Sequence, residues 1–325
     1  MINILVTGVG SLLGQGIIKT IKKSNIKSNI FGTDYFETAV GLYWVKKGYL
    51  LPDVLKKSNL KNWLTKFIYI CRKEKIDIII PGLDFETPIL SKYKTTIEKK
   101  TKSKILVSPI NVIKTCNDKW ETIEFLKKNN FLYPKSCLPN NINKFLINNK
   151  FPLIVKPRFE STSKNISIVK NINELKKSLI NCKKPIIQEI VGNKKNEYTC
   201  GSTLINGKIL STITLKRELK NGNTKIAFHN KNINLDDFLC DVTKKLVPYG
   251  PTNFQLMLTK NGPVIFEINP RFSGTTPIRA MFGLNEIDLI LSEIYKLKIK
   301  KNKLKYGTII RYFEDFYVNN KDLIK

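Results

Sequence analysis

Histidine is almost absent from this chain of 325 residues, which contains only His229. The six cysteines form no C-x-x-C pair and follow no regular spacing. Zinc sites draw on clustered cysteines and histidines, and a cysteine nucleophile usually needs a histidine partner. The sequence therefore argues against a zinc site and against cysteine–histidine catalysis, and its length excludes a small disulfide-stapled scaffold.

Long apolar runs are also missing. No segment approaches the 18 uninterrupted apolar residues that a membrane-spanning helix needs. The first residues, MINILVTG, lead straight into a strand pattern without the basic stretch and apolar run of a secretory leader. Hydrophobic residues make up 42% and charged residues 25%, which is ordinary for a folded chain of two or three domains. We expect a cytoplasmic protein with no membrane partner.

Acidic residues and arginine are both scarce relative to lysine. The chain has 56 basic and 26 acidic residues, a net charge of +30 and a pI near 9.8. Only six of the basic residues are arginines, and the 50 lysines are spread along the whole chain together with 33 asparagines. Nucleic-acid binding needs clustered charge, and base reading favours arginine. We expect no specific nucleic-acid partner, whereas anionic small substrates remain compatible with this charge.

The first third of the chain alternates strand and helix patterns. Such alternation predicts a parallel, doubly wound sheet with helices on both faces. We predict helices at residues 12–23 and 60–75, and strands at residues 2–7, 30–33, 49–51, 77–81 and 105–107.

The pattern changes after residue 113 to one typical of an α+β fold. Helices are expected at residues 114–128, 172–181, 236–246 and 287–295. The expected strands are 153–156, 166–169, 186–189, 197–205, 208–215, 254–259, 264–269 and 308–318.

A glycine-rich turn, Gly8-Val-Gly-Ser-Leu-Leu-Gly14, follows the first strand, and Asp34 ends the second. Dinucleotide-binding folds place a pyrophosphate and a ribose-binding acid at these positions. However, Leu13 stands where the third glycine of G-x-G-x-x-G belongs. We interpret the segment as a structural turn, with nicotinamide binding as the alternative.

A hairpin at residues 253–271 carries the most informative polar pattern. If Asn261 centres the turn, Gln255 lies directly opposite Glu267, and Asn269 projects from the same face as Glu267. We expect Phe254, Leu256, Phe266 and Ile268 to point the other way. One carboxylate between two amide oxygens suits Mg²⁺ bound to nucleotide phosphates. The spacing alone supports a solvated sheet face equally well.

Two lysines and two polar segments complete the candidate site. Lys119 lies within the helix expected at residues 114–128, and Lys156 ends an apolar strand just before a loop rich in serine. Hydroxyl and amide groups of such a loop can surround a phosphate while a lysine meets its charge. The strand 186–191 ends in a polar hinge whose backbone could meet an adenine edge, with Glu197 in reach of a ribose.

Taken in this order, these pieces resemble the ATP-grasp superfamily, most closely its carbamoyl phosphate synthase large-chain-like branch of carboxylate–amine ligases. The resemblance covers nearly the whole chain and is carried by ILVTGVG at residues 4–10, IIIPGLDFE at 78–86 and FEINPRFSG at 266–274. It implies a preliminary Rossmann-like domain at residues 1–113, followed by a small ATP-grasp subdomain at 114–190 and a large subdomain at 191–325.

The resemblance also implies roles for individual residues. The expected metal ligands are Gln255, Glu267 and Asn269, holding Mg²⁺, with Mn²⁺ as a substitute. The expected ATP-binding residues are Lys119, Lys156, Ser161, Ser163, Lys164, Gln188, Glu189, Ile190, Val191 and Glu197. Arg271, Lys156 and Arg279 are expected to act on the substrate carboxylate or its acyl phosphate, and Arg217 and Arg311 are further cations that could line the substrate cleft.

The resemblance implies an enzyme that phosphorylates a small carboxylic acid with ATP and couples it to an amine or amino acid. Two alternatives remain open at this point. One is a phosphotransferase that stops after phosphoryl transfer, and the other is a nucleotide-binding or NAD-binding protein without ligase activity. If the chain self-associates, we expect a homodimer.

Overall fold

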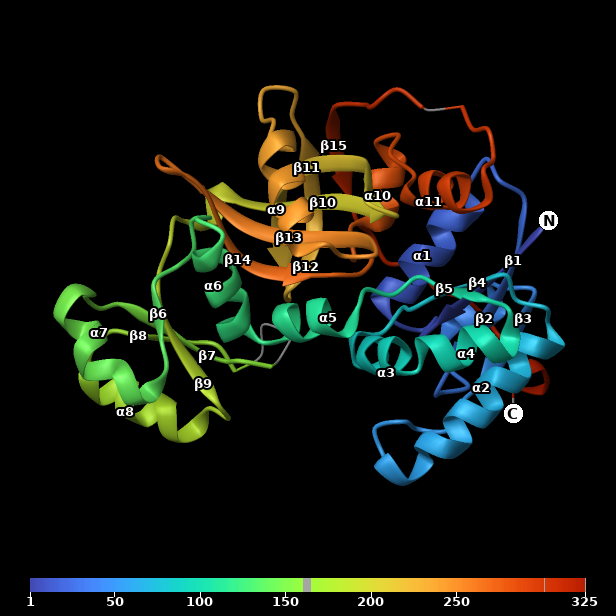
Figure 1. Ribbon diagram of the computed structural model, residues 1–325, viewed down its shortest axis with the longest axis horizontal. Coiled ribbons are helices and arrows are strands. Elements are labelled where there is room, and N and C mark those ends of the chain that lie inside the picture. The colour runs from blue at the N-terminus through green and yellow to red at the C-terminus, as the bar shows by residue number, and fades with distance from the viewer. Residues whose placement is uncertain (160–164, 301, 325) are drawn as a thin grey trace.

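A computed structural model describes residues 1–159, 165–300 and 302–324 and contains three separate sheets (Figure 1). The first sheet is parallel, and the other two are antiparallel. The expected fold class, a doubly wound α/β domain followed by a two-part α+β structure, is confirmed.

The parallel sheet has the strand order β3-β2-β1-β4-β5. Its strands are β1 (Ile2–Thr7), β2 (Ser28–Asp34), β3 (Lys47–Leu50), β4 (Ile78–Ile80) and β5 (Lys104–Ile105). The covering helices are α1 (Leu12–Lys22), α2 (Leu60–Lys73), α3 (Thr87–Lys92) and α4 (Lys94–Thr101). Strand order reverses direction between β1 and β4, where doubly wound folds open a crevice at the carboxyl ends of the strands.

Alternating side chains of β1 divide this domain's core into two halves. Ile4 and Val6 pack with α1, whereas Leu5 packs on the opposite face with Trp63 and Phe67 of α2. Successive strand residues point to opposite faces, so an apolar run such as ILV is buried on both sides. Helices therefore have to cover both faces of the sheet.

The small antiparallel sheet forms a separate lobe at the left of Figure 1 and has the order β6-β9-β7-β8. Its strands are β6 (Ser136–Cys137), β7 (Leu153–Pro157), β8 (Ser167–Val169) and β9 (Pro185–Glu189). Helices α7 (Ile142–Asn148) and α8 (Ile172–Asn181) supply its apolar cover, with Leu175 fully buried.

The large antiparallel sheet has the order β14-β13-β10-β11-β12-β15. Its strands are β10 (Glu197–Ile205), β11 (Lys208–Lys220), β12 (Asn223–His229), β13 (Gly250–Thr259), β14 (Gly262–Asn269) and β15 (Gly307–Ile310). Helices α9 (Asp236–Leu246), α10 (Thr276–Met281) and α11 (Glu286–Tyr295) follow or interrupt these strands. One face of the sheet is buried against α9 through Leu239 and Val242, whereas Leu215 on the opposite face packs against Ile278 and Phe282 of the α10 segment.

Two sequence expectations need correction, and several short elements were not predicted. The single helix expected at 114–128 is two helices, α5 (Ile110–Asn117) and α6 (Lys119–Lys128), because Asp118 adopts an extended conformation and caps α6. The last strand ends at Ile310 instead of continuing to 318. Strand β12 was not anticipated, and it places an additional hairpin beside the candidate site.

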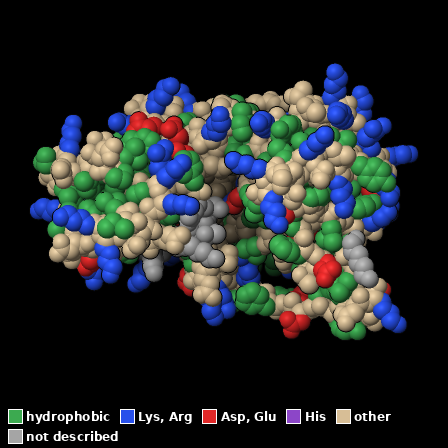
Figure 2. All heavy atoms as spheres, turned by 90° about the horizontal axis from the view of Figure 1, so that it is seen from below, with side chains coloured by type: hydrophobic (Ala, Val, Ile, Leu, Met, Phe, Trp, Pro, Cys, Tyr) green, Lys and Arg blue, Asp and Glu red, His purple; other side chains and the backbone are tan. Residues whose placement is uncertain are grey.

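Lysine and arginine side chains are spread around the whole outline of the face in Figure 2, as their distribution along the sequence predicts. Within the described ranges, no helix has the length and apolar character needed to cross a membrane.

Candidate active site

The hairpin formed by β13 and β14 has the predicted register at its open end. Gln255 lies opposite Glu267, and Asn253 lies opposite Asn269. Nearer the turn, the pairing of the two strands is shifted by one residue. A bulge between Gln255 and Leu256 accounts for this shift. The extra residue of β14 is Phe266, which lines the polar face instead of joining Phe254 in the core, so its predicted direction was wrong. A bulge of this kind redirects one side chain locally.

Lys119 and Lys156 are brought together by an ion pair between their sequence neighbours. The Asp118 carboxylate accepts from the backbone N–H of Trp120 and from Nε of Arg158, both at 2.9 Å. The backbone N–H of Lys119 also donates to the Arg158 carbonyl at 3.0 Å. Asp118 thus ties the start of α6 to the end of β7.

A pocket of about 750 Å³ lies between the small and the large sheet. The predicted residues that line it are Lys119, Lys156, Gln188, Glu189, Val191, Glu197, Gln255 and Glu267. Apolar walls come from Ile154, Met257 and Phe266. Cavities of this size with convergent polar groups are typical of small-molecule sites.

The Lys156 ammonium is strongly perturbed by its surroundings. The residue is only 6% exposed, and its pKa is lowered to about 8, mainly by burial. The positive charge of Lys119 acts in the same direction as burial, and the Glu267 carboxylate opposes both effects. A buried cation with a second cation nearby favours an anionic ligand that would neutralise both.

Arg217 of β11 is a fixed member of the same pocket. Its guanidinium donates to the Glu197 carboxylate through Nε at 2.9 Å and to Oε1 of Gln255 through Nη2 at 2.8 Å. The sequence had identified Arg217 only as one of several cations that could line the cleft. Its contacts place it between the expected ribose acid and an expected metal ligand.

The donor set on β13 and β14 fits a hard cation that keeps other oxygen ligands. Glu267 supplies a carboxylate, and Gln255 and Asn269 supply amide oxygens, each with two lone pairs. Across the described ranges, no group of three or more His, Cys, Asp or Glu side chains could hold a metal by itself. A single carboxylate with two amides suits Mg²⁺ that completes its shell with phosphates and water.

Arg271 lies beyond the metal strand, at the contact with the parallel-sheet domain. Its Nε donates to Oδ1 of Asp84 at 2.5 Å, and its Nη2 donates to Oδ2 of Asp84 and to Oδ1 of Asn269, both at 3.2 Å. Burial lowers the pKa of the guanidinium, but the charges of Asp84 and Glu267 outweigh burial and raise it overall. Arg271 therefore stays charged.

Arg279, an expected substrate contact, does not line the pocket. It is 0% exposed on α10, and it donates to Oε1 of Glu286 at 3.0 Å and to Oδ1 of Asn253 at 2.6 Å. Because Asn253 also accepts from the Thr199 hydroxyl, Arg279 is held in a buried polar cluster, and its contact with a substrate stays a prediction. Arg311 is also held within the fold, where its guanidinium donates to the carbonyl of Gly274.

The remaining residues that were expected to contact ATP differ in their position relative to the pocket. Ser161, Ser163 and Lys164 lie outside the described residues. Ile190 does not line the pocket and is 40% exposed. Glu189 lines the pocket, and its Oε1 accepts from the backbone N–H of Lys135 at 2.7 Å.

The sequence interpretation missed the turn at residues 221–223, which also lines the pocket. Asn221 and Gly222 have φ angles of 52° and 75°. Positive φ at both central residues identifies the hairpin turn that Asn-Gly favours. The Lys-Asn-Gly-Asn segment was therefore a readable signal for both the turn and strand β12.

The glycine-rich turn after β1 is packed against its own chain. The backbone N–H of Gly10 donates to Asp34 Oδ2 at 2.7 Å, and the other oxygen of Asp34 accepts from Tyr35. A Cβ on Gly10 would lie 2.7 Å from the Cβ of Ala39. These contacts support the structural interpretation of the turn.

Comparison with known proteins adds independent evidence on the family. Residues 116–275 match the ATP-grasp domain model, and residues 4–105 match the PylC-like N-terminal domain model. An uncharacterized Mycoplasma genitalium protein, MG011, is 32% identical over 42% of this chain and 45% of its own length. The carbamoyl phosphate synthase large chain of Helicobacter pylori is 25% identical over 97% of this chain and 31% of its own length. This chain thus spans less than half the length of both relatives.

A solved structure shares the fold at low sequence identity. N5-carboxyaminoimidazole synthetase from Staphylococcus aureus, crystallised with ADP, has a TM-score of 0.71 and 16% identity over 95% of this chain and 80% of its own. The two family models together span both lobes around the pocket and the parallel-sheet domain beside them. The chain is therefore an ATP-grasp protein whose ATP-grasp domain follows a PylC-like N-terminal domain.

Proposed function

We propose that this protein is an ATP-dependent ligase that activates a small carboxylic acid as an acyl phosphate and couples it to an amine or amino acid. The observation that carries the proposal is one pocket in which Lys119 of α6 and Lys156 of the small sheet face Gln255 and Glu267 of the large sheet. Cations and oxygen ligands opposed in this way suit a polyphosphate with its metal ion.

The pocket residues, together with the neighbouring Asn269, divide into four groups by their chemistry. Lys156 and Lys119 meet the charge of the phosphates, and Glu267, Gln255 and Asn269 hold Mg²⁺, which neutralises phosphate charge when bound. The apolar walls, with Met257 and Phe266, cover the adenine ring, and the hinge after β9 offers backbone groups to its edge. Arg217 orients the Glu197 carboxylate toward the ribose.

The proposed reaction has two steps. An oxygen of the substrate carboxylate attacks the γ-phosphorus of ATP, and the bond to the bridging oxygen breaks to release ADP. The amine nitrogen then attacks the acyl carbon, phosphate leaves, and the nitrogen loses a proton. Lys156 and Lys119 offset negative charge as the phosphoryl group moves, since fixed cations in a water-poor site stabilise such charge strongly.

Trapping the activated acid tests this proposal. The protein would be incubated with ATP, Mg²⁺, hydroxylamine and a panel of small carboxylic acids, and hydroxamates and nucleotides would be separated. We expect hydroxamate and ADP in equal amounts with the correct acid. AMP with pyrophosphate would reject the mechanism, because it indicates adenylation. A stable phosphorylated product that no amine discharges would reject ligation in favour of the phosphotransferase alternative.

The proposal also covers the location, the partners and the assembly of the protein. We propose that it acts in the cytoplasm on small molecules, with no specific nucleic-acid partner and with a homodimer as its assembly if it self-associates. Mn²⁺ should replace Mg²⁺, because it accepts the same oxygen ligands. Domain limits of 1–113, 114–190 and 191–325 remain proposals, and the first of them falls inside α5.

A further inference from the structure

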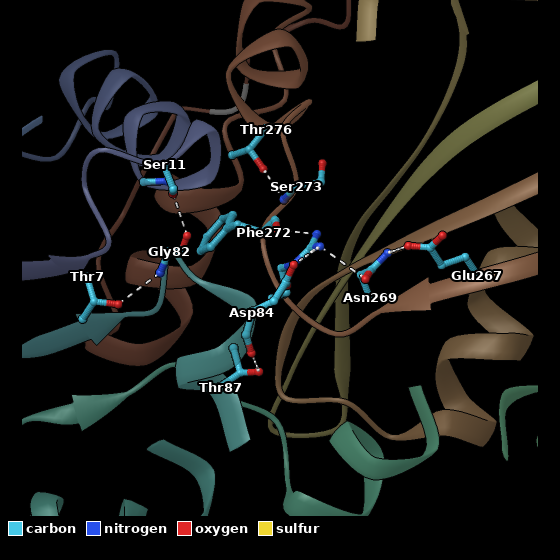
Figure 3. Close-up of polar contacts among 12 residues, drawn as sticks. Thr7, Ser11, Gly82, Asp84, Thr87, Glu267, Asn269, Phe272, Ser273 and Thr276 are labelled. Carbon is cyan, nitrogen blue, oxygen red and sulfur yellow. Dashed lines mark hydrogen bonds and ion pairs between the residues drawn. The ribbon is translucent and has the colours of Figure 1, made fainter. Parts of the chain in front are cut away.

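A continuous chain of polar contacts links the parallel-sheet domain to the expected metal ligands (Figure 3). It begins at Asp84, which follows β4, passes through Arg271 and Asn269, and ends at the Glu267 carboxylate. In Figure 3 the side chains of Asn269 and Glu267 point toward one another, with Asp84 on the opposite side of Asn269. Two domains therefore contribute to one row of interactions.

The orientation of the Asn269 amide is determined by its two neighbours in this row. Arg271 only donates, so the atom facing it at 3.2 Å must be the amide oxygen. Glu267 accepts, so it receives the amide nitrogen, at 2.9 Å. Asn269 is only 9% exposed, which restricts its rotation. Its oxygen retains one lone pair, and that lone pair is the one a metal ion would use.

Arg271 can direct this amide only while its own side chain is held. Asp84 binds the guanidinium through both carboxylate oxygens, which fixes the plane as well as the position of the group. The Asp84 backbone is fixed in turn, because its carbonyl accepts from the Thr87 hydroxyl at 2.8 Å. Two residues further on, the fully buried Glu86 accepts from Thr7 of β1 and from the Tyr35 hydroxyl.

We propose that Asp84 is a positioning residue for the metal site, supplied by the N-terminal domain and acting through Arg271 on the Asn269 amide. This inference rests on the proposed function only in taking Gln255, Glu267 and Asn269 as metal ligands. Groups that orient metal ligands commonly contribute a factor of 10 to 100 in metal affinity. The N-terminal domain would thereby contribute to metal binding without touching the metal.

Metal binding in the presence of ADP tests the proposal without any acid or amine. Free Mn²⁺ would be measured by electron paramagnetic resonance at saturating ADP, and the affinity for ADP alone would be measured without metal. For Asp84→Ala we expect Mn²⁺ affinity to fall about 10- to 100-fold, with metal-free ADP affinity unchanged. Asp84→Glu, which retains the carboxylate, should recover part of the loss.

Asp288→Asn is the matched control, because Asp288 of α11 joins the same two domains elsewhere. Its carboxylate accepts from the backbone N–H and the side-chain amide of Asn25, both at 3.1 Å. We expect Asp288→Asn to leave Mn²⁺ affinity unchanged. Equal losses in both variants, or a loss of metal-free ADP binding in Asp84→Ala, would overturn the proposal in favour of a general structural role.

The outcome separates this inference from the proposed ligase activity. Normal Mn²⁺ affinity in Asp84→Ala would reject the positioning role, whatever the hydroxamate experiment shows. A protein that retains no Mn²⁺ with ADP before any substitution would reject the metal site and this inference with it. Loss of Mn²⁺ affinity in Asp84→Ala without hydroxamate from any acid would support the inference and contradict the ligase.

Discussion

The Lys156 ammonium and the Glu267 carboxylate belong to different sheets and face one pocket, where the carboxylate opposes the effect of burial on the lysine's pKa. The pKa of Lys156 nevertheless falls to about 8. A nucleotide that brings several negative charges into this pocket should raise it again. Lys156 should therefore take up a proton when the phosphates of a nucleotide bind.

ATP binding should take up protons at pH 8.5 and very few at pH 6.5. Near pH 8.5 a large share of Lys156 is neutral before binding and charged afterwards, whereas at pH 6.5 it is charged throughout. Calorimetric titration in two buffers of different ionisation enthalpy measures this uptake. Lys156→Met should abolish the buffer dependence at pH 8.5, and a heat independent of buffer in the unmodified protein would contradict the assignment.

Glu267→Gln should reduce the rate of ADP formation by a factor on the order of 100, since it removes the only carboxylate among the metal ligands. Thermal unfolding should change little, because the side chain is only half-buried on the pocket face. Initial rates over a range of Mg²⁺ concentrations measure the effect. Glu124→Gln, an exposed position on α6, is the control. An unchanged Mg²⁺ dependence would argue against the metal role.

Asp118→Ala should weaken ATP binding as well as stability. Loss of a helix N-cap costs about 1 kcal/mol, but Asp118 also binds Arg158 and so fixes Lys119 relative to Lys156. Asn171→Ala removes a comparable cap from α8, where Asn171 accepts from the N–H of Glu174. Both variants should unfold at lower temperature, and only Asp118→Ala should lose nucleotide affinity in calorimetry. Equal affinities would leave Asp118 with its capping role alone.

Glu86 should make the protein less stable as pH rises from about 5 to 7. The pKa of this carboxyl is raised to about 7, mainly by burial and also by the charge of Asp34, while hydrogen bonds from Thr7 and Tyr35 oppose the rise. The folded state then holds the proton more tightly than the unfolded state, so its advantage is complete at low pH and is lost as pH approaches 7. The loss amounts to about 3 kcal/mol.

Denaturant unfolding at several pH values tests this prediction, with Glu86→Gln as the neutral comparison. The amide oxygen can still accept from one of the two hydroxyls of Thr7 and Tyr35, and the amide nitrogen can donate to the other, so the fold should be retained. The difference in unfolding free energy between the two proteins should vary across pH 5 to 7. Parallel curves would show that Glu86 does not titrate in this range.

The N-terminal domain should not bind a nicotinamide cofactor. Leu13 replaces the third glycine of the dinucleotide motif, and Asp34 is engaged with the backbone N–H groups of Gly10 and Tyr35. Titration with NADH and NADPH should give no saturable heat at micromolar concentrations. Saturable binding there would reinstate the alternative interpretation of the turn.

Local patterns were sufficient for most elements of the fold and for part of the site. Strand β1 was predicted at its observed limits, because an alternating apolar run followed by a glycine turn has few other solutions. The pairing of Gln255 with Glu267 was also predictable, since an antiparallel hairpin fixes which residues oppose one another. Counting residues back from a hairpin turn does not reveal the bulge that redirects Phe266, because the bulge depends on the packing around that residue.

Contacts between distant segments were beyond prediction from sequence. Arg279 was expected at the substrate because it follows the metal strand, but burial against Glu286 decided its position. Arg271 was expected to meet the substrate, which stays a prediction, and nothing in the sequence indicated that its guanidinium binds Asp84, which lies 187 residues earlier in the chain. Nothing in the sequence around Asp118 indicated that its carboxylate would bind Arg158.

By itself, the sequence determined most of the strands, the pairing of Gln255 with Glu267 and the residue types that the hairpin offers to a metal ion. Those features depend on residue type and short-range periodicity, which can be read directly from the sequence. The tertiary structure alone decided which cations reach the pocket and which are held in ion pairs. The strength of a charge depends on burial and on partners brought from other domains, and no local pattern records either.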